Sequence, residues 1–147
     1  MDINAQNDCR AILGECASFQ LRKAARLTTN TFNDILKPTG LRSTQVSVLL
    51  GAGAHPGESI SSLANKLCLD VSTLQRSLMV LQKQGLVALA KGHQREKKVS
   101  LTEAGLQKAE EARPYWERAQ KRFLAAFGQE EWKDFLRAAR SFCDTDA

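Results

Sequence analysis

The sequence predicts a mainly α-helical fold with one small β-hairpin. Apolar residues recur at steps of three and four through most of the chain, which indicates amphipathic helices. After Gly85 this period gives way to a short continuous apolar run, residues 86–90, which is typical of a strand. Residues 99–101 are expected to form its returning partner. The chain of 147 residues fits a single domain, 1–147.

Two helices are expected in the first third of the chain. The longer one runs from about Cys9 to Leu36 and stops before Pro38. The next begins at a cap supplied by Ser43 or Thr44. It is expected to end in a loop containing Gly51, Gly53, Pro56 and Gly57.

Two shorter helices follow, and a tight turn joins them. The first lies at about residues 60–67, and Asp70 offers its carboxylate as the cap of the second. Three leucines mark the inner face of the second helix: Leu74, Leu78 and Leu81. Gly85 ends it. Two helices connected in this way form a helix-turn-helix unit.

The hairpin is followed by two further helices. Thr102 can cap the first of them, and Pro114 is expected to kink it because proline lacks a backbone donor. Gly128 separates it from the last helix. Six residues of the first helix lie at helical spacing: Leu106, Ala109, Trp116, Ala119, Phe123 and Phe127. The apolar residues of the last helix are Trp132, Phe135, Leu136, Ala139 and Phe142.

The positive charge of the chain is concentrated in its middle third. Residues 60–100 hold seven basic and two acidic side chains, a surplus of +5 that equals the net charge of the whole protein. The segments on either side nearly cancel. Such a cluster fits a polyanionic partner such as nucleic acid, and it also fits an ordinary solvated face.

Several classes of protein are excluded by what the sequence lacks. It has no apolar run of the length of a membrane span and no secretory leader, so we expect a cytoplasmic protein. We find no catalytic constellation or phosphate-binding loop and expect neither an enzyme nor a cofactor. Four scattered cysteines are expected to be reduced thiols rather than disulfides or metal ligands: Cys9, Cys16, Cys68 and Cys143.

Two stretches carry a resemblance to a known family. ISSLANKLCLDVSTLQR at residues 60–76 is typical of a helix-turn-helix, and VSLTEAG at residues 99–105 closes the hairpin. With the order of the expected elements, they resemble the MarR family (multiple antibiotic resistance regulators) of winged helix-turn-helix repressors. The resemblance implies a winged lobe at about 43–101, and dimerisation helices at about 8–37 and 103–144.

The resemblance also implies a function and a mechanism of release. We expect a transcriptional repressor that binds a pseudo-palindromic DNA operator as a homodimer. A small ligand or modification of a cysteine thiol would release it. The alternative is a winged-helix module that binds protein partners without specific DNA binding. That module is expected to lose the basic recognition face, which this chain keeps.

The expected DNA contacts lie on the second helix of the unit and on the hairpin. The helix offers Val71, Ser72, Thr73, Gln75 and Arg76 to the major groove. Arg95 at the hairpin tip is expected in the minor groove, and Lys97 and Lys98 on the backbone. Two positions depart from the family pattern: His93 stands where an aspartate usually steers the tip arginine, and Val71 where many relatives are polar or basic.

The expected switch involves an oxidant or a small molecule. Cys9 and Cys16 would face alike on one helix but lie about 10.5 Å apart, beyond the roughly 7 Å limit for a disulfide, so bonding would require the partner subunit. A buried cysteine can equally be a small hydrophobe. Three aromatic residues could line a ligand pocket or belong to the core: Phe19, Phe32 and Trp116.

Overall fold

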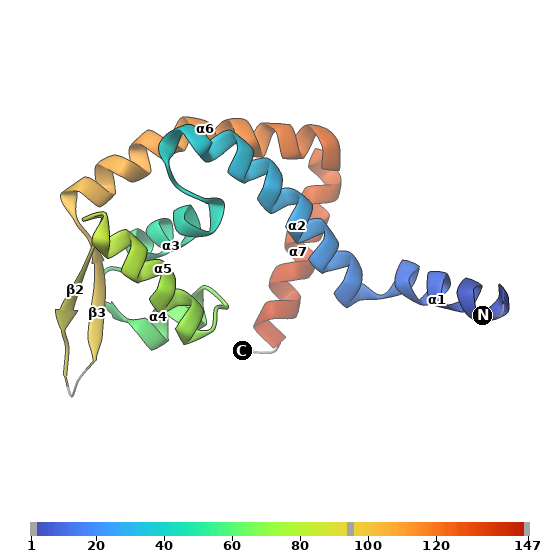
Figure 1. The fold of residues 1–147 in the computed structure, drawn as a ribbon, viewed down its shortest axis with the longest axis horizontal. Helices are drawn as coiled ribbons and strands as arrows, with labels where there is room; N and C mark the ends of the chain where they lie inside the picture. The colour runs from blue at the N-terminus through green and yellow to red at the C-terminus, as the bar shows by residue number, and fades with distance from the viewer. Residues whose placement is uncertain (1–2, 94–95, 146–147) are drawn as a thin grey trace.

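The computed structural model describes residues 3–93 and 96–145. These ranges hold α-helices and one small antiparallel sheet, which confirms the predicted fold class. Figure 1 shows a lobe built from the short middle helices and the sheet, and a frame of long terminal helices that passes over the lobe. Within the described ranges no helix is both long enough and apolar enough to cross a membrane.

Four terminal helices make the frame. They are α1 (Ile3–Glu15), α2 (Ala17–Leu36), α6 (Glu103–Phe127) and α7 (Gln129–Thr145). α2 packs along α6, whereas α1 extends away from the rest of the molecule (Figure 1). α7 turns back at Gly128, whose φ of 100° is accessible mainly to glycine.

The sequence predicted one helix from Cys9 to Leu36, and this was wrong at Cys16, where the chain bends between α1 and α2. Cys16 has an extended backbone, with ψ at 105°. The break leaves carbonyl groups without their usual helical donors. The side-chain amide of Gln20 donates to two of them, Leu13 O at 3.0 Å and Gly14 O at 3.1 Å. This side-chain cap stabilises the bend.

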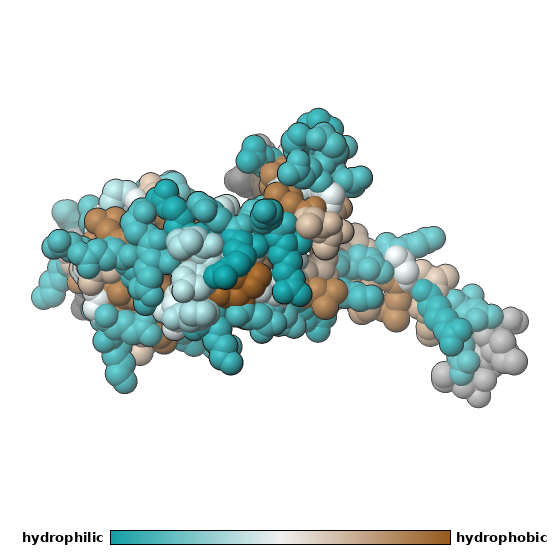
Figure 2. Space-filling model, turned by 90° about the horizontal axis from the view of Figure 1, so that it is seen from above, coloured by the Kyte–Doolittle hydropathy of each residue, from teal (hydrophilic) through white to brown (hydrophobic). Residues whose placement is uncertain are grey.

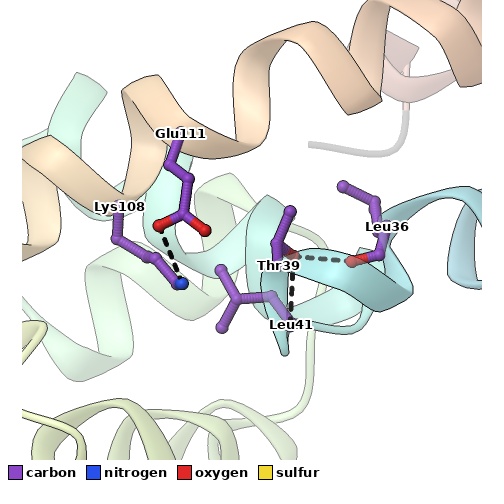
Figure 3. Close-up of polar contacts among 5 residues, drawn as sticks. All are labelled: Leu36, Thr39, Leu41, Lys108 and Glu111. Carbon is purple, nitrogen blue, oxygen red and sulfur yellow. Dashed lines mark hydrogen bonds and ion pairs between the residues drawn. The ribbon is translucent and has the colours of Figure 1, made fainter.

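A short connector joins α2 to the lobe. It contains the 3₁₀ turn η1 (Lys37–Thr39), in which the Thr39 side chain is buried. The Thr39 hydroxyl donates to Leu36 O at 2.7 Å and accepts from Leu41 N at 3.2 Å (Figure 3). The buried hydroxyl therefore finds both a partner for its proton and a donor for its oxygen inside the connector.

The next helix, α3 (Ser43–Ala54), is not capped as expected. Its N-cap is Arg42, whose amide donates to Gln45 Oε1 at 2.8 Å. Ser43 or Thr44 was expected to be the cap. Instead, Ser43 lies inside the helix, and its amide donates to Asn33 Oδ1 at 2.8 Å. A side chain of α2 thus accepts from a free amide at the start of α3 and links the two helices.

Glycines do not end α3, which continues through Gly51 and Gly53. A Cβ atom on Gly51 would lie 2.8 Å from the Leu67 side chain, and one on Gly53 would lie 2.9 Å from the Leu101 side chain. Both distances are too short for carbon atoms. These glycines therefore permit close packing of α3 against the elements that follow it, and the expected loop begins only after Ala54.

The lobe combines two short helices with a three-stranded sheet. The helices are α4 (Ile60–Lys66) and α5 (Val71–Lys83), and the strands are β1 (Glu58–Ser59), β2 (Val87–Lys91) and β3 (Lys97–Leu101). β3 lies in the middle of the antiparallel sheet. The hairpin of β2 and β3 confirms the expected one, with strands that extend further towards its tip. β1 was not expected, because a two-residue strand has no readable periodicity.

The beginning of α6 agrees with the sequence, and its apolar face does so only in part. The Thr102 hydroxyl accepts from Gly105 N at 3.0 Å, as a cap should. α6 continues as one helix across Pro114 and curves over the lobe (Figure 1). Its buried positions are small, Gly105, Ala112 and Ala119, whereas Leu106 and Trp116 are exposed.

The core of the lobe depends on leucine side chains from several helices. Leu49 of α3, Leu63 of α4 and Leu74, Leu78 and Leu81 of α5 are all at most 1% exposed. Burial of each such side chain stabilises the fold by about 1.5–3 kcal/mol. The expected inner face of α5 is therefore confirmed, and it anchors α5 to the lobe.

We expect Leu78→Ala to lower the free energy of unfolding by about 2–5 kcal/mol, because it leaves a cavity in this core. The control is Met79→Ala at the next residue, which is 66% exposed and should change stability by less than about 0.5 kcal/mol. Urea unfolding followed by circular dichroism measures both. Equal effects of the two substitutions would contradict the packing described here.

Candidate nucleic-acid interface

The helix-turn-helix begins at a well-defined cap. The Ser59 hydroxyl accepts from Ser62 N at 3.1 Å and starts α4. In the turn between α4 and α5, Leu69 N donates to Ala64 O at 2.9 Å, and Cys68 has a φ of 50°. A left-handed backbone at a residue other than glycine is uncommon. The turn is therefore held by backbone hydrogen bonds that return to α4.

Asp70 stands at the N-cap position of α5, as expected, but its carboxylate does not cap the helix. Its backbone carbonyl instead accepts from Thr73 N and Leu74 N, both at 3.0 Å. The Asp70 side chain is exposed. The predicted position was correct and the predicted side-chain hydrogen bond was wrong.

The residues expected to contact DNA lie on the outer side of α5. Val71, Ser72, Gln75 and Arg76 are exposed, and Thr73 is half-buried, while the leucines of the same helix face the core. The first two turns of α5 therefore present four side chains of different chemistry on one accessible surface. A helix presented in this way can enter the major groove of B-form DNA.

Arg76 lies back along the start of its own helix. Its guanidinium donates to Ser72 O at 3.3 Å and to the Thr73 hydroxyl at 3.3 Å. Across residues 3–93 and 96–145, the structure gives Arg76 no acidic partner within ion-pair distance. Its charge therefore remains available to an anion.

A groove of about 570 Å³ lies on the surface where α5, the start of α4 and the hairpin meet, and Glu96 is among the residues that line it. Val71 and Gln75 line it from the helix, and Lys97 lines it from β3. The structure thus brings together expected contact residues that are more than 20 positions apart in the chain. Met79 also lines the groove. It was not among the residues expected from the sequence, although it follows Val71 and Gln75 at the same spacing of four residues.

The hairpin places like charges opposite each other. In the register of β2 and β3, Lys91 faces Lys97 and Ala90 faces Lys98. Directly opposed like charges destabilise a strand pair. Arg95, the expected tip residue, lies outside the described residues. The exposed lysines of the two strands form an attractive surface for a polyanion.

One cation of the lobe is already paired. Lys66 Nζ lies 3.6 Å from Glu58 Oε1, which ties α4 to β1. A hydrogen bond from the Ser62 side chain, followed by the charge of Lys66, lowers the pKa of Glu58 below its ordinary value. The basic residues left for a partner are therefore those of α5 and the hairpin.

The residues expected to form a switch are spread along the terminal helices. All four cysteines are free thiols; Cys9 is exposed on α1 and Cys16 is half-buried at the helix break, so the two no longer share one helix. Phe32 packs against the core, whereas Trp116 is exposed. A hollow of about 670 Å³ beside α2 is instead lined largely by polar residues: Asn30, Asn33, Asp34, Lys37 and Arg42.

Comparisons with known proteins find transcriptional regulators. No family model matches the chain. The HTH-type transcriptional regulator YwoH of Bacillus subtilis, itself uncharacterised, is 30% identical over 124 residues, which cover 84% of this chain and 90% of that protein. The Mycobacterium tuberculosis regulator MosR, solved in complex with DNA, is 30% identical with a TM-score of 0.79, covering 90% of this chain and 96% of that one.

A third comparison supplies the fold alone. A MarR-family regulator from Rhodococcus sp. RHA1 has a TM-score of 0.80 at 24% identity, covering 89% of this chain and 94% of its own. A helix-turn-helix with an exposed helix face and a basic hairpin is the architecture of a winged helix-turn-helix DNA-binding protein, and the relatives at 30% identity are transcriptional regulators. The chain belongs to the MarR family of transcriptional regulators.

Proposed function

We propose that this regulator is a homodimeric repressor that binds a pseudo-palindromic operator. The observation that carries the proposal is the exposed N-terminal face of α5, which shares one groove with Lys97 of the hairpin. In a two-fold dimer, two such faces would read half-sites about one helical turn of DNA apart. The lobe at about 43–101 would read DNA, and helices at about 8–37 and 103–144 would form the dimer.

Each exposed side chain of α5 suits a different DNA group. Gln75 can pair with the N6 and N7 atoms of adenine, and Arg76 with guanine or a phosphate. The hydroxyls of Ser72 and Thr73 suit phosphates or base edges. Val71 suits a thymine methyl group. Because Arg76 has no acidic partner among the described residues, it would not have to break an ion pair to bind DNA.

The hairpin is proposed to contact the neighbouring part of the duplex. Lys97 and Lys98 would bind the phosphate backbone, and Arg95 at the tip would enter the minor groove. The opposed lysines at Lys91 and Lys97 support this role, because phosphates between them would relieve their repulsion.

Exposed apolar side chains on the frame support the proposed dimer. Ile12 of α1 is 67% exposed and Phe142 of α7 is 70% exposed, and Leu21 and Leu27 of α2 are also exposed. Figure 2 shows hydrophobic residues at the surface of the narrow arm that leads to the N-terminus. A large exposed apolar surface usually marks an interface, and a second copy of the chain would cover it.

A small molecule or a thiol oxidant is proposed to release the DNA. CouR from Rhodococcus jostii RHA1, a neighbour at 24% identity, was solved bound to p-coumaroyl-CoA. In the present chain, Cys16 lies half-buried at the bend between α1 and α2, where modification would act on the dimer body. Cys9 is exposed and open to oxidants.

Titration of labelled DNA from upstream of its own gene, followed by fluorescence anisotropy, tests the proposed function. We expect saturable binding that exceeds binding to random DNA and weakens steeply with salt. Binding no tighter than to random DNA, repeated with sites selected from a random library, would instead favour a module for protein partners.

Two substitutions should separate base reading from phosphate binding. We expect Gln75→Ala to cost about 1–3 kcal/mol of operator affinity and to relax specificity at one base pair. Lys98→Ala should weaken all DNA alike and reduce the salt slope by about 1. Gln84→Ala at the far end of α5 and Lys121→Ala on α6 serve as matched controls. Loss of specificity in Lys98→Ala would contradict the assignment.

Phe142→Glu should weaken the dimer, because it places a charge in the proposed interface. Loss of one buried aromatic contact, about 1.5–3 kcal/mol, corresponds to a rise of at least about tenfold in the dimer dissociation constant. Val80→Glu, which adds the same charge at an exposed apolar position of the lobe, is the control. Sedimentation velocity over a range of concentrations measures both. A wild-type monomer at micromolar concentration would refute the dimer.

For the thiol switch, we expect mild peroxide to reduce operator affinity of the wild type by about tenfold or more and to leave Cys16→Ser unchanged. Cys9→Ser and Cys143→Ser, tested in parallel, show which thiol is required. Anisotropy measures affinity, and mass spectrometry of the intact protein counts the oxygen atoms or disulfides formed. Equal loss of affinity in all three variants would exclude Cys9 and Cys16 as the switch.

A further inference from the structure

The side chain of Thr102 links the end of α5, the proposed DNA-reading helix, to the start of α6. Thr102 lies between β3 and α6, and its hydroxyl donates to Gly85 O at 2.6 Å. The same oxygen accepts from Gly105 N at 3.0 Å, and the backbone amide of Thr102 donates to Leu86 O at 3.1 Å. Thr102 therefore does more than cap α6, since it also holds the residues that leave α5.

Close backbone packing reinforces this connection between residues 85–86 and the first turn of α6, which we call the joint. A Cβ atom on Gly105 would collide with the carbonyl of Leu86, so the first turn of α6 lies directly against the exit of α5. Leu86 N in turn donates to Leu81 O at 2.9 Å, in the last turn of α5. The position of α6 is thus transmitted to α5 through a short series of directional contacts.

The other contacts of α5 hold it on α3 and α4. Leu74, Leu78 and Leu81 are buried in the core, and backbone hydrogen bonds hold the turn before the helix against α4. The hydrogen bonds of Thr102 are therefore the contacts that link the direction of α5 to that of α6. The reading residues begin at Val71, roughly 20 Å along the helix from the joint. A tilt of about 5° at the joint would move them by roughly 1.7 Å, which is enough to break a hydrogen bond to a base.

We propose that Thr102 is a positioning residue for DNA reading. Its hydroxyl sets the tilt of α5 relative to α6, and hence the separation of the two reading helices in the dimer. This inference rests on the proposed function, because half-site spacing has meaning only for a dimer on DNA. A change in the direction of α6 would reach the reading face through this joint.

Substitutions of Thr102 separate the joint from the cap. Asp accepts well from helix amides, so Thr102→Asp retains the hydrogen bond from Gly105 N. A carboxylate has no proton to donate to Gly85 O and repels that carbonyl. Thr102→Ser retains both hydrogen bonds and should behave as the wild type.

Two controls match the side effects of these changes. Ala104→Asp adds the same charge in the same helical turn, at an exposed position that makes none of the hydrogen bonds of Thr102. Thr39→Val removes a hydroxyl that makes the same pair of hydrogen bonds, one donated and one accepted, inside the connector (Figure 3). It shows what loss of stability alone does to DNA binding.

The experiment combines selection of DNA with a measurement that needs no DNA. Each full-length variant selects sites from a library of inverted half-sites at varied spacing, and residual dipolar couplings of backbone amides report the angle between α5 and α6. For Thr102→Asp we expect a changed angle and a loss of about tenfold in affinity at the wild-type spacing. Affinity for random DNA should match that of Ala104→Asp.

The outcomes separate the two proposals. An unchanged angle in Thr102→Asp, or a preferred spacing equal to that of Ala104→Asp, would overturn the role of Thr102. A wild type that selects no inverted site would overturn the proposed function, while the angle would still decide whether Thr102 sets the tilt. Rescue of angle and spacing by Thr102→Ser is the result expected if the hydroxyl is the cause.

Discussion

The amphipathic character of α5 is the constraint on which the rest of the structure depends. Leu74, Leu78 and Leu81 must be buried, and this fixes which residues of the same helix remain outside. α3 supplies much of the surface that buries them, and its glycines allow that surface to come close to its neighbours. The accessible face that begins at Val71 is thus a consequence of packing on the opposite side.

The parts that could be predicted from the sequence are those governed by local rules. The helical period of α5, its end at Gly85 and the cap at Thr102 each depend on neighbouring residues alone. The motif around them indicated the winged fold. On the helix, four of the five expected contact residues are exposed and the fifth, Thr73, is half-buried. Their roles on DNA remain a proposal.

The parts that could not be predicted depend on contacts between distant segments. Gly51 resembles a helix terminator in sequence, and only the position of Leu67 explains why it lies inside α3. The bend at Cys16 is an exception, because its contact is local: Gln20 donates to carbonyls six and seven residues earlier, but no standard sequence pattern marks such a cap. The second role of Thr102 required the position of Gly85, 17 residues away.

The opposed pair of Lys91 and Lys97 has a consequence for the response to ionic strength. In the free protein, added salt screens their repulsion and favours a closed hairpin. In the proposed DNA complex, the same salt would compete with the lysines for phosphate. Added salt therefore stabilises the hairpin of the free protein and would weaken its binding to DNA. The hairpin would be most ordered in the free protein at the salt concentrations at which DNA binds most weakly.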